Sequence, residues 1–480
     1  MSRYIQIIEV SQKQAYIFKS KKLKDNVQAS EIIRYITGTD CFAKVAKGMF
    51  SREKNLVYAG GGHSILTFDS QEQARNFAIS LSKYLYEKFP GIELFIKTMA
   101  YDEKLTPSEN ESNLLKELEK KKSIRMSAFR QGSFGIEKED AVADVNDAEA
   151  MKEVEKSDLF AAEEQKVLEG YHSAAAFEDL GGTRNDANFI AVVHADGNSM
   201  GARVKNIDKM PQCTDFESYR KIKQQFSEAI DEDFHAAILE MERRVRDELS
   251  KEDGALAELS MKGHAFPVRR LINAGDDVCL VTEGRIGIEC ARILLEELNK
   301  RNNSVDGQNY TACAGVAIVH CKYPFYKAYE LAEELCSNAK KKIAQVAEGI
   351  QCSAVDWHIE FGEMYGGIGE IREKEYHAKN TDGTVYSLTG RPYWICGEGT
   401  DQMLKYTDWK QMMDRLVSES EEDQMARGKY KNLRNAMAEG TLSSEAYRTL
   451  NRMNNGLKYE EDKPYLFDAL EMMDTFITMD

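Results

Sequence analysis

Two short stretches place carboxylates at the ends of apolar runs. The segment LINAGDDVCLV (271–281) carries Asp276 and Asp277 between two apolar stretches, and HADGNSMG (194–201) carries Asp196 directly after one. A surface hairpin could hold the adjacent pair, since Gly-Asp-Asp is a common turn. A metal site could hold it equally well, because carboxylate oxygens are the ligands that Mg²⁺ and Mn²⁺ prefer. The elements around these residues decide between the two interpretations.

Strand and helix patterns repeat in the same order in two parts of the chain. The first part predicts a strand at 3–10, helices, a hairpin at 56–68, a helix at 70–88 and a strand at 92–100. The second predicts a strand at 188–195, a helix at 215–249, a hairpin at 270–282, a helix at 285–301, a strand at 310–319 and a helix from Tyr326 to Lys342. This order is the β-α-β-β-α-β pattern of a ferredoxin-like sheet, which indicates an internal duplication.

These patterns predict an α+β protein of two ferredoxin-like domains with helical insertions and a helical C-terminal domain. The expected domains are a first sheet domain at 1–102, a charged helical connector at 103–187, a second sheet domain at 188–398 and a helical domain at 399–480. The connector contains EKEDAVADVNDAEAMKEVEKSD, a composition typical of a partly mobile segment.

The fold suggests how the carboxylates meet. In a ferredoxin-like sheet the first strand and the central hairpin are neighbours, so Asp196 and the Asp276–Asp277 turn would converge at one edge. Three carboxylates there would repel one another unless cations neutralised them. Two Mg²⁺ or Mn²⁺ ions would lower the pKa of an attacking hydroxyl and stabilise charge on a leaving pyrophosphate. Gly197 and Gly201 would let backbone N–H groups approach a triphosphate at the start of the following helix.

Composition excludes several other classes of function. The net charge of −16 disfavours a protein that binds nucleic acid mainly through nonspecific electrostatics. The nine cysteines form no C-x-x-C pair, so neither zinc nor a disulfide framework is indicated, and we expect a reducing, cytoplasmic location. No apolar run is long enough to span a membrane, the N-terminus lacks a signal-peptide layout, and no Walker A motif occurs. His194, His320 and His358 are interpreted as core or edge histidines.

Several segments together resemble one known family. PVRRLINAGDDVCLV, HADGNSMG and GVAIVHCKYPFYKAYELAEELCSNAKK are similar to the second palm domain of the polymerase-like large subunit of type III CRISPR effector complexes. IIEVSQKQAYIFKSKKLKDNVQASEII and YAGGGHSILTF resemble that family's first palm, and LTGRPYWI (388–395) resembles a segment after the second. The two ferredoxin-like domains would then be palm domains, the fold of nucleotidyl cyclases and polymerases.

The resemblance implies a nucleotidyltransferase that converts ATP into cyclic or short oligoadenylate messengers for antiviral defence, with Mg²⁺ or Mn²⁺ at a GGDD turn. In this sequence Ala274 replaces the first glycine of that turn, Asn198 stands where a second acid is frequent, and Lys340 matches a lysine near the nucleotide phosphates. Without the resemblance, Lys340 would be a solvated lysine at a helix end. The resemblance assigns Asp196, Asp276 and Asp277 to catalysis and metal binding. It assigns nucleotide binding to Gly60, Gly61, Gly62, Gly197, Asn198, Ser199, Gly201, Gly275 and Lys340.

The sequence also departs from this family. In the first palm, Gly61-Gly62 or an adjacent pair takes the place of the aspartates, so we expect no catalytic metal there, and Glu9 stands where the family often has an acid. The HD nuclease motif and the zinc-binding cysteines are missing. The expected partners are ATP, a downstream effector that senses a cyclic nucleotide, and either CRISPR subunits or further copies of this chain. Two alternatives stay open: a non-catalytic scaffold subunit of a CRISPR-like ribonucleoprotein, and a diguanylate-cyclase-like enzyme.

Overall fold

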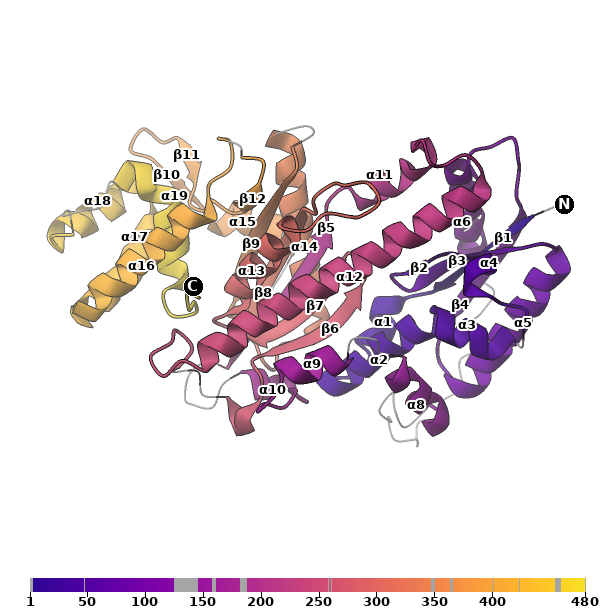
Figure 1. The fold of residues 1–480 in the computed structure, drawn as a ribbon. Helices are drawn as coiled ribbons and strands as arrows, with labels where there is room; N and C mark the ends of the chain where they lie inside the picture. Colours follow the sequence, from indigo (N-terminus) through magenta and orange to yellow (C-terminus); the bar gives the residue numbers. More distant parts are fainter. Residues whose placement is uncertain are drawn as a thin grey trace.

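Figure 1 shows the computed structural model of the chain, with the first sheet at the N-terminal end, a second sheet in the middle and a group of helices at the opposite end. The structure describes residues 3–46, 48–124, 146–157, 161–181, 188–257, 259, 261–346, 350–362, 366–399, 401–422, 424–453 and 459–479.

The first sheet has the predicted ferredoxin-like topology. Its strands are antiparallel and lie in the order β2-β3-β1-β4. They are β1 (Tyr4–Val10), β2 (Leu56–Gly60), β3 (His63–Phe68) and β4 (Leu94–Ala100). The helices between them are α1 (Lys13–Ile17), α2 (Leu23–Ile36), α3 (Thr39–Ala46), α4 (Arg52–Asn55) and α5 (Gln71–Lys88).

The second sheet repeats this topology and extends it. Its order is β12-β9-β8-β5-β7-β6, in which β6-β7-β5-β8 corresponds to the four strands of the first sheet. The strands are β5 (Phe189–Gly197), β6 (Val268–Ala274), β7 (Asp277–Glu283), β8 (Ala312–His320), β9 (Cys352–Glu360) and β12 (Tyr393–Gly397). The accompanying helices are α11 (Met200–Lys205), η1 (Ile207–Lys209), α12 (Phe216–Leu249), η2 (Lys262–His264), α13 (Gly287–Asn299), α14 (Phe325–Val346) and α15 (Ile368–Glu375), and a small hairpin pairs β10 (His377–Lys379) with β11 (Val385–Ser387). The predicted fold class is confirmed.

The added strands β9 and β12 were not anticipated from the sequence. The β9 segment CSAVDWHIE looks too polar for a buried strand, yet it pairs in parallel with β8. Its Asp356 is fully buried, and its carboxylate accepts hydrogen bonds from the two terminal guanidinium nitrogens of Arg372 at 2.6 and 2.8 Å. Because this ion pair satisfies the carboxylate, the strand can enter the sheet. Pairing partners of this kind are invisible to a hydrophobic pattern.

The segment 103–187, which we expected to be a helical connector, contains four helices among its described residues, joined by turns and loops. It forms α6 (Pro107–Ser123), α8 (Ala148–Lys156), α9 (Ala161–Val167) and α10 (Phe177–Leu180). Helix α6 packs on β4 and β1 through buried Leu114 and Leu118. It therefore packs against the first sheet, as α14 packs against the second. The partial mobility expected for 103–187 stays a prediction, and residues 125–145, 158–160 and 182–187 of this segment lie outside the described residues.

The two sheets are joined by reciprocal helix packing. Helix α12, which follows the first strand of the second sheet, packs on β2 of the first sheet, while α2, which follows the first strand of the first sheet, packs on β6 of the second. In Figure 1 α12 runs along the molecule from the side of the first sheet to the second. This exchange gives the two halves a pseudo-twofold relation and places their hairpin turns on either side of a shared space.

The C-terminal region is helical, as predicted. It contains α16 (Tyr406–Glu422), α17 (Gln424–Glu439), α18 (Thr441–Leu450) and α19 (Tyr459–Met472). It is tied to the second sheet through Arg391, whose guanidinium lies 3.2 Å from Asp468 and 2.9 Å from Glu471, with all three side chains buried. Among the described residues, no helix combines the length and the apolar character needed to cross a membrane.

Candidate active site

The three candidate acids lie at one edge of the second sheet. Strand β5 extends two residues further than predicted, which places Asp196 within the strand, directly opposite Asp277 on β7. The carbonyl of Asp276 accepts the backbone N–H of Gly197 at 3.2 Å. The Asp276 side chain lies over Gly197, because a Cβ built on Gly197 would be 3.0 Å from the Cβ of Asp276. The structure therefore brings Asp196, Asp276 and Asp277 together.

The turn between β6 and β7, Ala274 to Asp277, is called the second turn from here on. Gly275 has φ of +70°, a left-handed conformation that a glycine adopts without strain. Its N–H donates to the Asp231 carboxylate of α12 at 2.8 Å. Ala274 lies in the last position of β6, where an alanine fits the extended backbone, so the replacement of the first glycine leaves the turn intact. The hairpin prediction for this segment is confirmed.

Lys340 projects from α14 onto the site. Its ammonium donates to Asp196 Oδ2 at 2.5 Å and to the carbonyl of Gly197 at 2.9 Å. This lysine is thus not a solvated side chain at a helix end, because it neutralises one of the three acids.

The remaining two acids carry perturbed pKa values. Burial, with the neighbouring Asp196 charge next in size, raises the pKa of both Asp276 and Asp277 to about 7. One oxygen of Asp277, Oδ1, has no hydrogen-bond partner, and His194 Nδ1 lies 3.5 Å away. Burial lowers the pKa of His194, so this ring is neutral at pH 7. His194, interpreted from sequence as a core or edge histidine, is a buried neighbour of the site.

The donor set suits a hard cation. An all-oxygen cluster with an unpaired carboxylate oxygen matches the preference of Mg²⁺ and Mn²⁺. Within the described residues, no group of three or more His, Cys, Asp or Glu side chains is already gathered closely enough to hold an ion, and Lys340 occupies Asp196. Cation binding would therefore require small side-chain movements among these acids.

The other predicted residues of the HADGNSMG segment have distinct surroundings. Gly197 has no space for a side chain, since a Cβ there would also lie 2.7 Å from Met200 Cγ. Asn198 donates its side-chain amide to the carbonyl of Cys352 at 2.8 Å, which ties it to β9. Ser199 adopts φ of +59° and caps the short helix α11 without a side-chain hydrogen bond, and Gly201 faces open space. Their predicted roles in nucleotide binding stay predictions.

The turn between β2 and β3, Gly60 to His63, is called the first turn. The N–H of Val10 donates to the carbonyl of Gly62 at 3.2 Å, the same bond that Gly197 makes to Asp276 in the second sheet. Glu9 lies opposite His63, as Asp196 lies opposite Asp277. The pair that takes the place of the aspartates is therefore Gly62-His63, one residue later than Gly61-Gly62.

The lysines complete this correspondence. Lys122 of α6 donates to Glu9 at 2.9 Å, as Lys340 of α14 donates to Asp196. Lys13 adds a further cation: it donates to the carbonyl of Gly61, and its stem fills the space beside Gly62. Among the described residues of the second half, we find no lysine in the corresponding contact. Sequence reasoning missed Lys13, Lys122, His63 and Asp231. The internal repeat was the available signal for Lys122, because aligning the two halves places it near Lys340.

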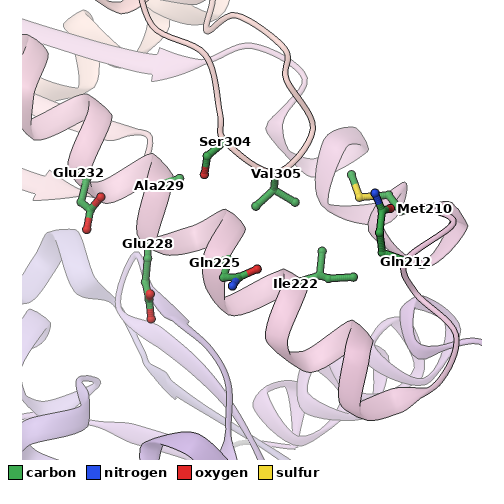
Figure 2. A pocket seen from close by; sticks show the side chains of 9 residues that line it. All are labelled: Met210, Gln212, Ile222, Gln225, Glu228, Ala229, Glu232, Ser304 and Val305. Carbon is green, nitrogen blue, oxygen red and sulfur yellow. The ribbon is translucent and has the colours of Figure 1, made fainter.

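A cavity of about 960 Å³ lies between α2 and α12 and reaches both turns. Its walls include the first turn, Asp231, Asp277 and Tyr329. A second hollow of about 580 Å³ lies between α12 and the loop that carries Ser304 and Val305 (Figure 2), and none of the candidate acids lines it. The first cavity is therefore the one continuous with the candidate site.

The fold matches that of known proteins. Residues 189–346 match the family model described as Cas10/Cmr2, second palm domain. The chain has a Cas10-like fold. No protein with a curated description matches the sequence. The predicted resemblance to the large subunit of type III CRISPR complexes is confirmed.

Solved Cas10-like structures cover nearly the whole chain. A Csm1–Csm4 cassette in complex with cA4 aligns with a TM-score of 0.57 and 13% identity over 98% of this chain and 69% of that one. The same cassette in complex with cA3 aligns with a TM-score of 0.57 and 15% identity, covering 99% of this chain and 70% of that one. In complex with one ATP it aligns with a TM-score of 0.58 and 14% identity, with the same two coverages. At these identities the likeness establishes the Cas10-like fold.

Proposed function

We propose that this Cas10-like chain is a metal-dependent nucleotidyltransferase that joins ATP into cyclic or short oligoadenylates and releases pyrophosphate. One observation carries the proposal: the second palm keeps three acids at one sheet edge, and one carboxylate oxygen has no hydrogen-bond partner. Its similarity to proteins solved with ATP, cA3 and cA4 supports adenine nucleotides as the substrate class.

The chain's own residues have separate tasks in this reaction. Asp196, Asp276 and Asp277 would hold Mg²⁺ or Mn²⁺. The cation would lower the pKa of the acceptor hydroxyl and stabilise charge on the leaving pyrophosphate. Lys340, already bonded to Asp196, would exchange this carboxylate for a phosphate oxygen when substrate binds. Gly61 of the first turn and Gly275 of the second would leave room for nucleotides close to the backbone, because a Cβ on either would meet no atom closer than 3.9 Å.

The two palms explain why the product would be a short oligomer. Both turns border one cavity, so a donor and an acceptor nucleotide can lie side by side. Only the second turn carries the acids, hence one bond is made at a time, and ring closure requires the product to turn round in the cleft. The net charge of −16 also disfavours a template strand.

The decisive experiment incubates the purified protein with each NTP and Mn²⁺ and identifies products by mass spectrometry. We expect adenylate oligomers from ATP, and none from an Asp276→Asn/Asp277→Asn variant. Product from GTP alone would overturn the substrate and favour the diguanylate-cyclase-like alternative. A required DNA or RNA template would overturn the cyclase. Absence of product with every NTP, alone and with added CRISPR subunits, would favour the scaffold alternative.

Two further parts of the proposal concern partners. The similar proteins were solved as Csm1–Csm4 cassettes, which supports a CRISPR subunit as a partner of this chain. A cyclic product would act through an effector protein that senses it. Measuring the molar mass by light scattering, for the chain alone and mixed with a Csm4-type subunit, distinguishes a heteromeric complex from a homo-oligomer.

A further inference from the structure

A single face of helix α12 contacts both strand β2, which leads to the first turn, and the second turn. Arg220, Gln224, Ser227 and Asp231 follow one another at spacings of four, three and four residues, which places them on one stripe of the helix. Arg220 and Gln224 donate to the carbonyl of Leu56 at 3.2 and 2.9 Å, and Ser227 donates to that of Ala59 at 3.5 Å. The stripe thus follows β2 of the first sheet towards the first turn.

The last member of the stripe, Asp231, reaches the second turn. It accepts the N–H of Gly275 at 2.8 Å, and Gly275 directly precedes Asp276 and Asp277. The positive φ of Gly275 turns this N–H out of the β6–β7 ladder, so the carboxylate is its partner. Asp231 is half-buried and lines the cavity, which means that its side chain is not needed to fill a core.

The helix that presents Asp231 is well anchored. Its Phe226, Ile230 and Phe234 are buried in the core that α12 shares with the second sheet and α13. No carboxylate among the described residues accepts a backbone N–H of the first turn: Lys13 holds that turn through the carbonyl of Gly61, and Ile33 of α2 lies behind Gly62. The acceptor bond from α12 is therefore a feature of the acid-bearing turn.

We propose that Asp231 is a positioning residue that fixes the second turn, and with it Asp276 and Asp277, at a set distance from the first turn. It acts through its carboxylate oxygen, which accepts the hydrogen bond from the backbone N–H of Gly275. The inference rests on the proposed metal site. Burial raises the pKa of Asp231 to about 6. An asparagine in its place would keep an acceptor oxygen without the charge.

The test measures Mn²⁺ binding by calorimetry in the absence of nucleotide, and product formation as a function of Mn²⁺. Asp231→Asn keeps the acceptor oxygen. Asp231→Ala and Asp231→Leu both remove it; alanine leaves the space of the side chain empty, whereas leucine fills it. Glu240→Ala is the matched control, because Glu240 lies on the same helix and makes an exposed pair with Arg243.

We expect Asp231→Ala and Asp231→Leu to weaken Mn²⁺ binding by about 10–100-fold, the usual effect of removing a partner behind a metal ligand. Asp231→Asn and Glu240→Ala should bind Mn²⁺ like the unaltered protein. Saturating Mn²⁺ should restore most of the product formation in the Ala and Leu variants, which a general loss of fold would not allow. Thermal unfolding of each variant identifies any that does not fold.

Unchanged Mn²⁺ binding in either folded variant without the acceptor would overturn the proposal. Equal weakening in Asp231→Asn would also overturn it, since charge rather than the acceptor oxygen would then matter. Failure of the proposed function is separate: the unaltered protein would make no oligoadenylate, while the order of Mn²⁺ affinities among the variants would still report on Asp231.

Discussion

The first and second turns share a backbone and differ in charge. The same hydrogen bond closes both, from Val10 to Gly62 and from Gly197 to Asp276, each at 3.2 Å. The first turn faces Glu9 with Lys13 and Lys122, a set with a net charge of +1 when His63 is neutral. The second turn itself carries Asp276 and Asp277, and it faces Asp196 with Lys340, a set with a net charge of −2 when all three acids are ionised. A duplicated frame can therefore carry a net negative charge at one turn and a net positive charge at the other.

The largest expected effect comes from removing the acids of the second turn. Asp276→Asn/Asp277→Asn should abolish product formation, because the metal would lose two of its three carboxylates. The fold should persist, with equal or higher thermal stability, since repulsion from Asp196 is relieved. His63→Asn alters the residue of the first turn that corresponds to Asp277, so it serves as the control and should keep product formation. Full activity in the double variant would contradict the catalytic assignment.

The next effect concerns space at the first turn. Gly61→Val should lower kcat/KM by about 100-fold, because a branched side chain would stand where a nucleotide must lie and misplace it. Gly91→Val is the matched control for backbone strain, since Gly91 has φ of +93° and faces open space. Equal loss of activity in both variants would indicate strain alone. A nucleotide-bound structure with the first turn far from every ligand would refute the acceptor surface.

The two lysines sharpen the comparison directly. Lys340→Met should lower kcat/KM by about 10-fold or more, since the variant loses the only cation that bonds the acids of the second turn among the described residues. Lys122→Met removes the corresponding bond to Glu9, beside the turn at which we expect no catalytic metal, and should lower kcat/KM less. Steady-state kinetics of both variants at saturating Mn²⁺ makes the comparison. A larger loss of kcat/KM for Lys122→Met than for Lys340→Met would indicate that the reaction takes place at the first turn, and it would contradict the proposed site.

The smallest effect is a pair of opposite pH dependences in the metal-free protein. The pKa of Asp276 and Asp277 is about 7 in the folded state and about 3.9 when unfolded, so they lower stability as pH rises from about 4 to 7. Burial lowers the pKa of His63 to about 4, against about 6.5 unfolded, so His63 lowers stability as pH falls from about 6.5 to 4.

Thermal unfolding across pH 4–7 separates these contributions. The Asp276→Asn/Asp277→Asn variant should lose stability less than the unaltered protein as pH rises, and His63→Asn should lose less as pH falls. Identical pH profiles for all three proteins would show that neither turn titrates as described. Added Mn²⁺ should stabilise the unaltered protein more at pH 7 than at pH 5, because protons compete for the same carboxylates.

Much of the fold was predictable because apolar periodicity records it directly. The duplicated order, the long helix α12 and both hairpins were read from spacing alone. The polar strand β9 was missed, since its buried Asp356 depends on Arg372 from a later helix. The three acids could be found because their types and turn residues are unusual in apolar surroundings. Asp231 and Lys13 could not, because an acid or lysine on an amphipathic segment looks solvated until the partner strand is placed.

The covalent joining of two palms changes what a single substitution does. In an assembly of identical chains, every altered residue appears in both halves at once, so a loss of acids would disable both sites. Here the two halves are encoded separately, and Gly62 and His63 can stand where Asp276 and Asp277 stand in the other copy. The tether also keeps the two halves together at any dilution. A fused chain can therefore evolve two different turns, which a symmetric dimer of identical chains cannot.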